Sequence, residues 1–404
     1  MSNILLTISE ITNKALFVLE NNLKAAKQVN RQYDDRFGQA GAKIGTTLNI
    51  RKPIRPIAAQ GPALNSQNFV ETEVPITLDQ NPNIGLTFSS VELRLSLDMF
   101  SDRVLAPAVA NLANKVDFDV LGNYINVYNA VGTPGTVPST SDTYLSARQK
   151  LNEEAAPDDA QYRATLISPA MEGAAIKAFG TLFNPQSDIA KQYRTGTLGV
   201  VYGSKWSMDQ NVNIHTFGIA TGSPEVATTS TSGDTTLATK GWTASQTGIV
   251  KKGDVFTVAA VNAVNPQNYQ STGSLRMFVV TADANSDASG NATISVSPSI
   301  TSSGQFQTVD ALPQANAVIT PLGSSSKQSA QGLLFHRDAI VLASADLELP
   351  GGVDKAARVA DDQVGLSLLM VRQYDINTGN YPTRVELLYG TATIRPEFAV
   401  RICS

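Results

Sequence analysis

The chain has 404 residues and a formal net charge of -4, and charged residues make up only 16% of it. A chain of this length exceeds what one hydrophobic core usually serves, so we expect two or three domains. The low share of charge suits a protein whose surface is largely covered by copies of itself, because interface centres are depleted in charge. The net charge of -4 gives no reason to expect tight binding to a phosphate backbone, which needs clustered lysine and arginine.

The cysteine content and the first residues bear on where the protein is made. Its single cysteine, Cys403, excludes an internal disulfide framework. The first residues lack the basic segment and the apolar run of a secretory signal. We therefore expect the chain to be made and kept in a cytoplasm. No apolar run approaches the length of about 18 residues that a membrane span needs, so no membrane association is expected.

The N-terminal segment predicts a helix. Apolar residues recur at helical spacing through the first 31 residues, and a capping-box pattern stands at Thr7–Glu10. Lys24, Lys27 and Arg31 follow at helical spacing. They either form a solvated face, which is the ordinary case, or contact an acidic surface of a partner.

A long excursion of two or three strands is expected next, because apolar residues alternate with a period of two from Gly41 to Leu95. Its turn-rich tip lies at residues 53–62. An isolated hairpin is marginal in water, so we expect a second copy of the chain to support it. In addition to the three N-terminal cations, the residues expected at contacts between subunits are Arg51, Lys52, Arg55, Val70, Val74 and Ile76.

Helical periodicity returns from Leu97 to Val131, and a helix from Pro107 to Asn129 would be about 30 Å long at about 1.5 Å per residue. Residues 140–219 then mix the two element types without regular repetition, which predicts an α+β domain and not a Rossmann sheet. The elements expected there are a helix at Tyr144–Glu154, a strand at Ala164–Ser168, a helix at Pro169–Phe179 and a strand at Gly199–Tyr202.

Residues 222–325 differ in composition, being rich in Ser, Thr, Ala and Gly and free of helical patterns. They predict a small all-β domain inserted into the chain, with strands at Val255–Val264, Leu275–Thr281, Ala292–Ile300 and Ala317–Thr320. The mixed pattern resumes at Gly332 and ends in strands at Thr383–Tyr389 and Ala392–Cys403. This return indicates one parent domain that the insert interrupts.

Residues that carry catalysis or bind metals are sparse. The two histidines, His215 and His336, stand in no catalytic motif, and His336 is expected to cap a helix or to lie at an interface. Cys403, in a strand-like run, is expected to be a buried, inert thiol. The segment Asp283–Asp287 imitates the start of a calcium loop but lacks its glycine and its closing glutamate, so a turn is expected. We expect no enzymatic activity, no cofactor and no metal.

The order of these elements resembles the major capsid (coat) proteins of tailed bacteriophages with the Hong-Kong-97-type fold, in particular those of short-tailed phages that carry an inserted β domain. The segments that carry the resemblance are Leu112–Asp117 for the spine helix, Gly196–Gly199 with Tyr202 and Gly203 for the second domain, Gly248–Asp254 for the start of the insert, Leu334–Ala339 for a helix after the insert, and Arg384–Gly390 for the closing strands.

The resemblance implies a division of the chain into seven parts. These are an N-terminal helical arm (1–40), an extended β hairpin with the start of the peripheral domain (41–95), the spine helix of that domain (96–135), the first part of an axial domain (136–221), an inserted, barrel-like β domain (222–325), the second part of the axial domain (326–382) and the closing strands of the peripheral domain (383–404).

The same resemblance implies self-assembly into pentamers and hexamers of an icosahedral shell in the bacterial host cytoplasm. It also implies a scaffolding protein, a portal, and enclosed double-stranded DNA that is not bound sequence-specifically. Gly41, Gly45, Gly132 and Gly135 are the hinges expected to move when the shell expands. Two alternatives stay open: a nanocompartment shell protein of the same fold, and a Ser/Thr-rich surface adhesin.

Overall fold

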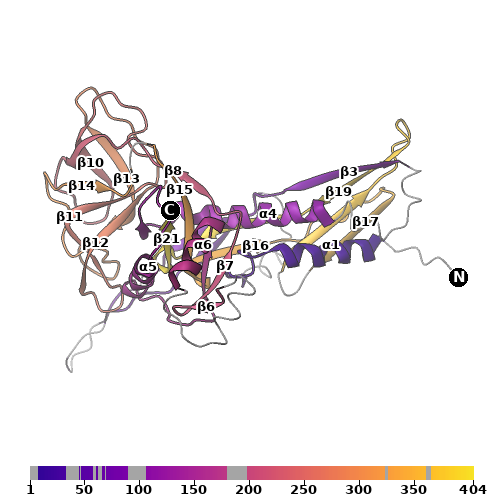
Figure 1. Ribbon diagram of the computed structural model, residues 1–404, viewed down its shortest axis with the longest axis horizontal. Coiled ribbons are helices and arrows are strands. Elements are labelled where there is room, and N and C mark those ends of the chain that lie inside the picture. Colours follow the sequence, from indigo (N-terminus) through magenta and orange to yellow (C-terminus); the bar gives the residue numbers. More distant parts are fainter. Residues whose placement is uncertain are drawn as a thin grey trace. The chain divides into compact units, whose positions relative to one another are not determined.

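The computed structural model describes residues 8–32, 45, 47–57, 61, 66–68, 70–89, 106–179, 198–323, 326–360 and 365–404. Contacts divide the chain into two compact units (Figure 1). Unit 1 comprises Met1–Ile50, Glu73–Val120 and Ile340–Ala392, and unit 2 comprises Arg51–Thr72, Leu121–Ala339 and Thr393–Ser404. No helix among the described residues is long and apolar enough to cross a membrane.

Unit 1 contains two helices and three small sheets. The helices are α1 (Ile8–Asn22) and α4 (Ala106–Gly122). One two-stranded sheet pairs β1 (Thr47–Arg51) with β2 (Glu73–Thr77), and another pairs β16 (Ile340–Ser344) with β20 (Tyr389–Thr393). The third sheet has the strand order β17 (Lys355–Ala360), β18 (Ser367–Arg372), β19 (Asn380–Glu386) and β3 (Asn83–Ser89).

Helix α1 ends earlier than the predicted limit at residue 31, because a buried carboxylate takes over the hydrogen bonds of the backbone that follows. Asp117 of α4 accepts the backbone N–H of Lys24 at 2.7 Å and that of Ala26 at 2.9 Å. The chain beyond Asn22 thus turns around Asp117 and does not continue the helical ladder. The capping residue Thr7 lies outside the described residues.

The spine helix is also shorter than predicted. Helix α4 ends at Gly122, and a 3-10 turn, η3 (Asn123–Asn126), follows in unit 2. Residues expected to complete the helix pair with the last strand instead: the carbonyl of Val127 accepts Arg401 Nε at 2.8 Å, and that of Asn129 accepts the Arg401 backbone N–H at 2.8 Å.

The β excursion is confirmed only in part. Strands β1 and β2 pair as expected, but β3 joins β19 in the four-stranded sheet. The alternation of apolar residues, on which the prediction rested, identifies each strand without saying which strand it pairs with.

Unit 2 is built around a seven-stranded sheet. Its strand order is β4 (Ala130–Gly132), β21 (Ala399–Cys403), β15 (Gln328–His336), β5 (Arg163–Ile167), β7 (Ser204–Met208) and β6 (Val200–Val201), and β8 (Ile214–Thr216) pairs with β15. Helices α5 (Ser141–Glu153) and α6 (Pro169–Phe179) lie where the sequence predicts them. The mixed α+β class is confirmed.

The helix expected at residues 334–339 is wrong. These residues form the end of strand β15 and one 3-10 turn, η4 (Arg337–Ala339). The apolar residues Leu333 to Phe335 are too few to tell a buried strand from a buried helix, and here they belong to the strand between β21 and β5. His336 therefore ends a strand and is buried, and its Nδ1 accepts the backbone N–H of Asp338 at 3.4 Å, so that it caps the 3-10 turn η4 and not an α-helix.

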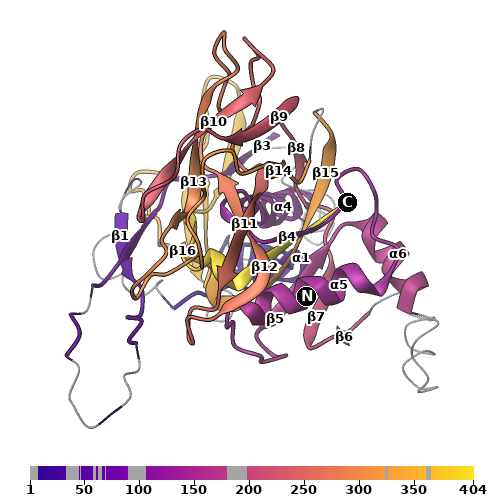
Figure 2. The same ribbon diagram turned by 90° about the vertical axis from the view of Figure 1, so that its left-hand side faces the viewer.

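The inserted domain is a barrel of six strands. Their order is β14 (Ile319–Pro321), β11 (Val255–Val264), β12 (Ser271–Val280), β13 (Ala292–Ile300), β10 (Asp234–Trp242) and β9 (Gly222–Val226), and a bridge between Glu225 and Val318 joins the two end strands. Phe256, Phe278 and Trp242 are among the residues of its core. Figure 2 shows the strands of this barrel facing the viewer.

The residues after the insert do not all return to one domain. Strands β16 to β20 belong to unit 1, whereas β15 and β21 belong to unit 2. The contacts thus divide the chain near residues 340 and 393, and not at the expected boundary between residues 382 and 383.

Candidate functional site

The two chain segments that extend β1 and β2, residues 51–57 and 66–72 without residue 69, form a narrow ribbon in unit 2. Lys52 donates its backbone N–H to the Thr72 carbonyl at 2.8 Å, and Arg51 pairs with Glu71 at 3.1 Å. Apolar side chains on this ribbon face solvent: Ile54 is 41% exposed, Ile57 36% and Val70 52%. Exposed apolar groups on a thin, two-stranded element are typical of a surface that another chain covers.

The ribbon also has partners within its own chain, at its base. Arg55 Nη2 lies 2.8 Å from Glu397 Oε1, and Glu397 is buried. Burial lowers the pKa of the Lys52 ammonium, while Glu397 acts in the opposite direction. Arg55 therefore anchors the base of the ribbon through Glu397, and Arg55 and Lys52 remain candidates for contact with a neighbour.

The remaining residues predicted at contacts are placed differently from one another. Val74 is half-buried on β2, and Ile76 is fully buried in the core of unit 1. Ile76 is therefore wrong as a residue that meets a neighbour, since its side chain already packs inside its own chain. Lys24 and Lys27 are exposed, Lys27 pairs with Glu20 at 3.4 Å, and Arg31 is half-buried.

The four candidate hinges also differ. Gly45 has a φ of 88° and Gly135 a φ of 80°, with no close neighbours at the Cβ position of Gly45 and none nearer than 3.9 Å at that of Gly135. Gly132 has a φ of 94° and pairs with Cys403, and a Cβ atom there would overlap the Cys403 carbonyl. Gly41 lies outside the described residues.

A buried polar cluster joins the inserted barrel to the seven-stranded sheet. Asp254, just before β11, lies 2.8 Å from His215 Nε2 and accepts the backbone N–H of Gly218 at 2.9 Å. His215 Nδ1 lies 3.1 Å from the Tyr124 hydroxyl. Arg401 of β21 donates to the Gly253 carbonyl at 2.7 Å. These hydrogen bonds connect the start of β11 to β8 and β21 of the sheet.

A second buried cluster joins the barrel to α5. Arg276 Nη1 of β12 lies 2.6 Å from Glu154 Oε1, just after α5, and the guanidinium lies 4.4 Å from the centre of the Tyr128 ring. Burial raises the pKa of Tyr128 well above its ordinary value. Neither cluster was predicted from the sequence. A signal was present: Arg276 and Arg401 each stand inside an apolar strand, where a charge needs a partner.

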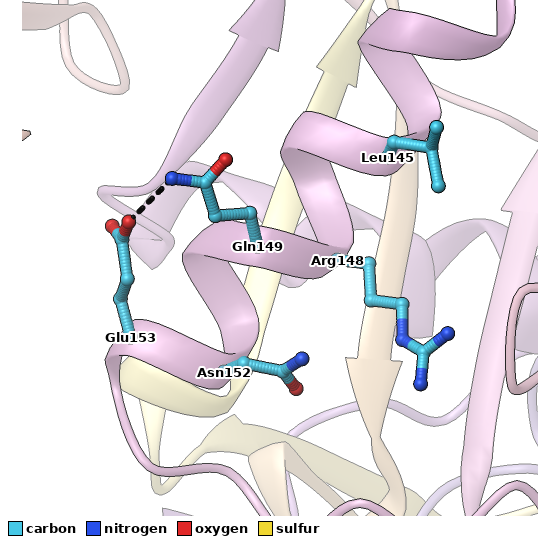
Figure 3. A pocket seen from close by; sticks show the side chains of 5 residues that line it. All are labelled: Leu145, Arg148, Gln149, Asn152 and Glu153. Atoms are coloured by element: carbon cyan, nitrogen blue, oxygen red, sulfur yellow. Dashed lines mark hydrogen bonds between the residues drawn. The ribbon is translucent and has the colours of Figure 1, made fainter.

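The outer face of α5 carries a depression lined by Leu145, Arg148, Gln149, Asn152 and Glu153 (Figure 3). Gln149 donates to Glu153 at 2.7 Å, and the other side chains point in different directions. These groups include no nucleophile beside a base. In the part of the chain that the structure describes, no group of three or more His, Cys, Asp or Glu residues is placed to hold a metal ion.

Cys403 is buried in β21, as expected. Burial raises the pKa of its thiol, the opposite of what a reactive thiolate needs. In the segment Asp283–Asp287, Ala284 forms a β-bridge with Val250, and a turn follows at residues 287–290. The Asp287 carboxylate accepts the backbone N–H groups of Ser289 and Asn291, both at 2.8 Å.

Comparison with known proteins adds a family and several similar structures. Residues 218–402 match the model of the P22 coat protein family, described as gene protein 5. No curated protein matches the chain.

Three solved structures illustrate the similarity. A chain of Mycobacterium phage Che8 is 14% identical over 94% of this chain and 90% of that one, with a TM-score of 0.46. A chain from the asymmetric unit of the bacteriophage PhiM1 mature capsid is 11% identical over 88% and 81%, with a TM-score of 0.42. The CUS-3 coat protein I-domain is 24% identical over 25% of this chain and 96% of that one, with a TM-score of 0.19.

The family match begins at the start of the inserted barrel and runs through the strands of both units that follow it. Over these residues the match agrees with the expected order of elements. The match favours a phage coat protein over a surface adhesin or a nanocompartment shell protein. The match supports a major capsid protein of a tailed bacteriophage, a structural protein, in which residues 218–402 are similar to the P22 coat protein family.

Proposed function

We propose that this coat protein assembles as pentamers and hexamers of an icosahedral shell around double-stranded DNA, from a precursor that forms with a scaffolding protein and a portal in the host cytoplasm and later expands. The observation that carries the proposal is the ribbon, residues 51–57 and 66–72 without residue 69. It exposes Ile54, Ile57 and Val70 on an element too thin to bury them itself.

A second copy of the chain supplies the missing cover in this proposal. Burying one such side chain is worth about 1.5–3 kcal/mol before the costs of association. Each contact is therefore weak, and a shell multiplies it over many copies. A ribbon of one copy on a different surface of the next is a heterologous contact, which closes into rings when the rotation permits.

The charge of the chain supports enclosure of DNA without sequence-specific binding. The net charge of -4 provides no excess of cations for phosphate neutralisation. Lys24 and Lys27, exposed after α1, are cations that an acidic segment of a scaffolding protein would meet. We assign the chain no catalytic role.

The test is electron microscopy of the purified chain, alone and with its scaffolding protein. The variant Ile54→Ser/Val70→Ser should stay folded by circular dichroism and fail to close shells, because the apolar contact between copies is lost. Val318→Ser is the matched control, since Val318 is 52% exposed like Val70 but lies on the barrel. Normal shells from the double variant, or failure of the control as well, would contradict the role given to the ribbon.

Expansion requires hinges, and Gly45 and Gly135 have the conformational room for one. We keep Gly41 and Gly132 as candidates from the sequence. The backbone angles of these glycines, compared between precursor and expanded shells by electron cryomicroscopy, test the assignment. Unchanged angles at all four would remove it.

A further inference from the structure

The four-stranded sheet of unit 1 ends in two edge strands of different chemistry. Strand β17 carries Lys355 and Arg358, and Arg358 donates to the Leu347 carbonyl at 3.0 Å. Strand β3, at the opposite border of the sheet beside β19 (Figure 1), has the sequence Asn-Ile-Gly-Leu-Thr-Phe-Ser, with no charged residue and no proline.

Exposed strand edges in soluble proteins are usually protected, because a row of free N–H and C=O groups pairs with other chains. The protective devices are charges, prolines, bulges and short length. Strand β3 has none of them: seven consecutive residues, from Asn83 to Ser89, pair with β19 without a break in register. Among the residues that the structure describes, no strand pairs with the outer edge of β3.

The position of Pro382 shows which backbone groups of β3 face outward. Pro382 of β19 accepts the backbone N–H of Gln373 through its carbonyl, so its backbone polar group points toward the β18 side. Its partner across β19 and β3 is Thr87. In an antiparallel pair, two residues directly opposite each other either both bond across the pair or both direct their backbone N–H and C=O groups away from it. The N–H and C=O of Thr87 therefore point to the free edge.

The same alternation extends along the strand. Asn83, Gly85, Thr87 and Ser89 direct their backbone groups outward, while the residues between them bond to β19. The Asn380 carbonyl confirms this parity, because it accepts the N–H of Asp375 on the same side of β19 as Pro382. The outer edge of β3 thus offers a regular ladder of donors and acceptors to another strand.

We propose that an extended segment of a second copy of this chain pairs with the outer edge of β3 in the assembled shell. The inference rests on the proposed assembly, in which every copy is surrounded by others. An uncharged edge matches a protein partner, since interface centres are depleted in charge, and it offers no cation to DNA. Strand addition supplies affinity through backbone hydrogen bonds.

Hydrogen exchange followed by mass spectrometry tests this on the full chain, soluble and in empty shells assembled from it. About half of the amides of residues 83–89 should exchange fast in the soluble chain and slowly in shells, because four of the seven face outward. Residues 355–360 of β17, the charged edge, serve as the internal control and should not change. Equal exchange of residues 83–89 in both states overturns the proposal. Protection already present in the soluble chain also overturns it, since the chain itself would then cover the edge.

Thr87→Pro sharpens the test, because it removes one outward N–H and no hydrogen bond to β19. Thr87→Val keeps the N–H and is the matched control. The proline variant should fold normally and need a roughly tenfold higher concentration to form shells, the equivalent of about one hydrogen bond per contact. Assembly of both variants at the same concentration overturns the proposal. If the unsubstituted chain forms no shells, that result contradicts the proposed function itself. It is thus distinct from a result that contradicts only the pairing at β3.

Discussion

Arg276 and Glu154 form a buried ion pair, with Nη1 and Oε1 2.6 Å apart, between strand β12 of the inserted barrel and the end of helix α5. Asn129 also donates to Glu154, at 3.4 Å, and the Tyr128 ring lies against the guanidinium. The barrel is therefore joined to the rest of unit 2 by a fixed polar contact in addition to its chain connections.

Removing one partner of this pair should be strongly destabilising. Arg276→Met leaves the Glu154 carboxylate buried without its counter-charge, which typically costs about 3–5 kcal/mol. Urea unfolding of the variant, followed by circular dichroism, measures the loss. Arg276→Met/Glu154→Gln should be more stable than Arg276→Met alone, because no uncompensated charge remains. A loss below about 1 kcal/mol for Arg276→Met would show that the pair contributes little to holding the barrel.

The pH dependence of the same variants gives an independent check. Burial raises the pKa of Glu154, an effect that Arg276 opposes. Without Arg276 this pKa should rise further above that of the unfolded chain, so the folded state binds the proton more tightly and stability increases as the pH falls. Acid should thus partly rescue Arg276→Met. The double variant should show no such rescue when midpoints are compared at neutral and mildly acidic pH.

His336 should make the protein less stable in weak acid. The side chain is buried between the rings of Tyr162 and Phe398, and burial lowers its pKa, while Asp338 raises it and Arg163 and Arg337 lower it. Below pH 6.5, the ordinary pKa of histidine, His336 binds a proton in the unfolded chain but stays neutral in the folded chain. The free energy of unfolding therefore falls as the pH drops from 6.5 toward the lowered pKa of the folded state.

His336→Phe should flatten that part of the profile. The measurement is the urea midpoint of both proteins between about pH 5 and 7, the range in which an ordinary histidine titrates. The difference between the two profiles isolates the histidine from the carboxylates that titrate in both. Parallel profiles would show that His336 is protonated equally in the folded and unfolded states.

Asp117 should control the attachment of the N-terminal segment. Asp117→Ala removes the acceptor of the Lys24 and Ala26 backbone N–H groups, and each group left unsatisfied costs about 1–3 kcal/mol. Trypsin should then cleave faster after Lys24 and Lys27, as measured by mass spectrometry of timed digests. Asp142→Ala, an exposed carboxylate on α5, is the control and should leave the cleavage rate unchanged.

Elements whose signal is local could be predicted from the sequence. Strands Val255–Val264 and Ala292–Ile300 have the predicted bounds, as does helix Pro169–Phe179, because each is an apolar pattern of clear period between turn residues. Strand Gly222–Val226 was missed, since its glycine and proline are typical of loops. The helix at Leu334–Ala339 was expected only from the family resemblance, and the end of a strand and a 3-10 turn stand there instead.

Features that depend on distant residues could not be predicted in this way. Glu154 and Arg276 are separated by 122 positions, and no short motif relates them. Contact of the ribbon with a neighbour was expected from the alternation of its apolar residues alone. On this alternating run Val70 is exposed, whereas Ile76 is buried. A period of two tells which residues share a face, and the partner of that face comes from the fold.

Gly132 and Gly135 allow the two roles of a glycine to be separated. Both have a positive φ, a conformation that costs an alanine about 1–2 kcal/mol, but only at Gly132 would a Cβ atom overlap a backbone carbonyl, that of Cys403. Gly132→Ala should therefore lower the thermal unfolding midpoint of the soluble chain clearly more than Gly135→Ala, because it also separates β4 from β21. Equal losses would mean that strand β4 moves away from β21 at little cost, which is the property that a hinge at Gly132 requires. A larger loss at Gly132 leaves Gly135 as the position in this loop where the backbone has room to turn.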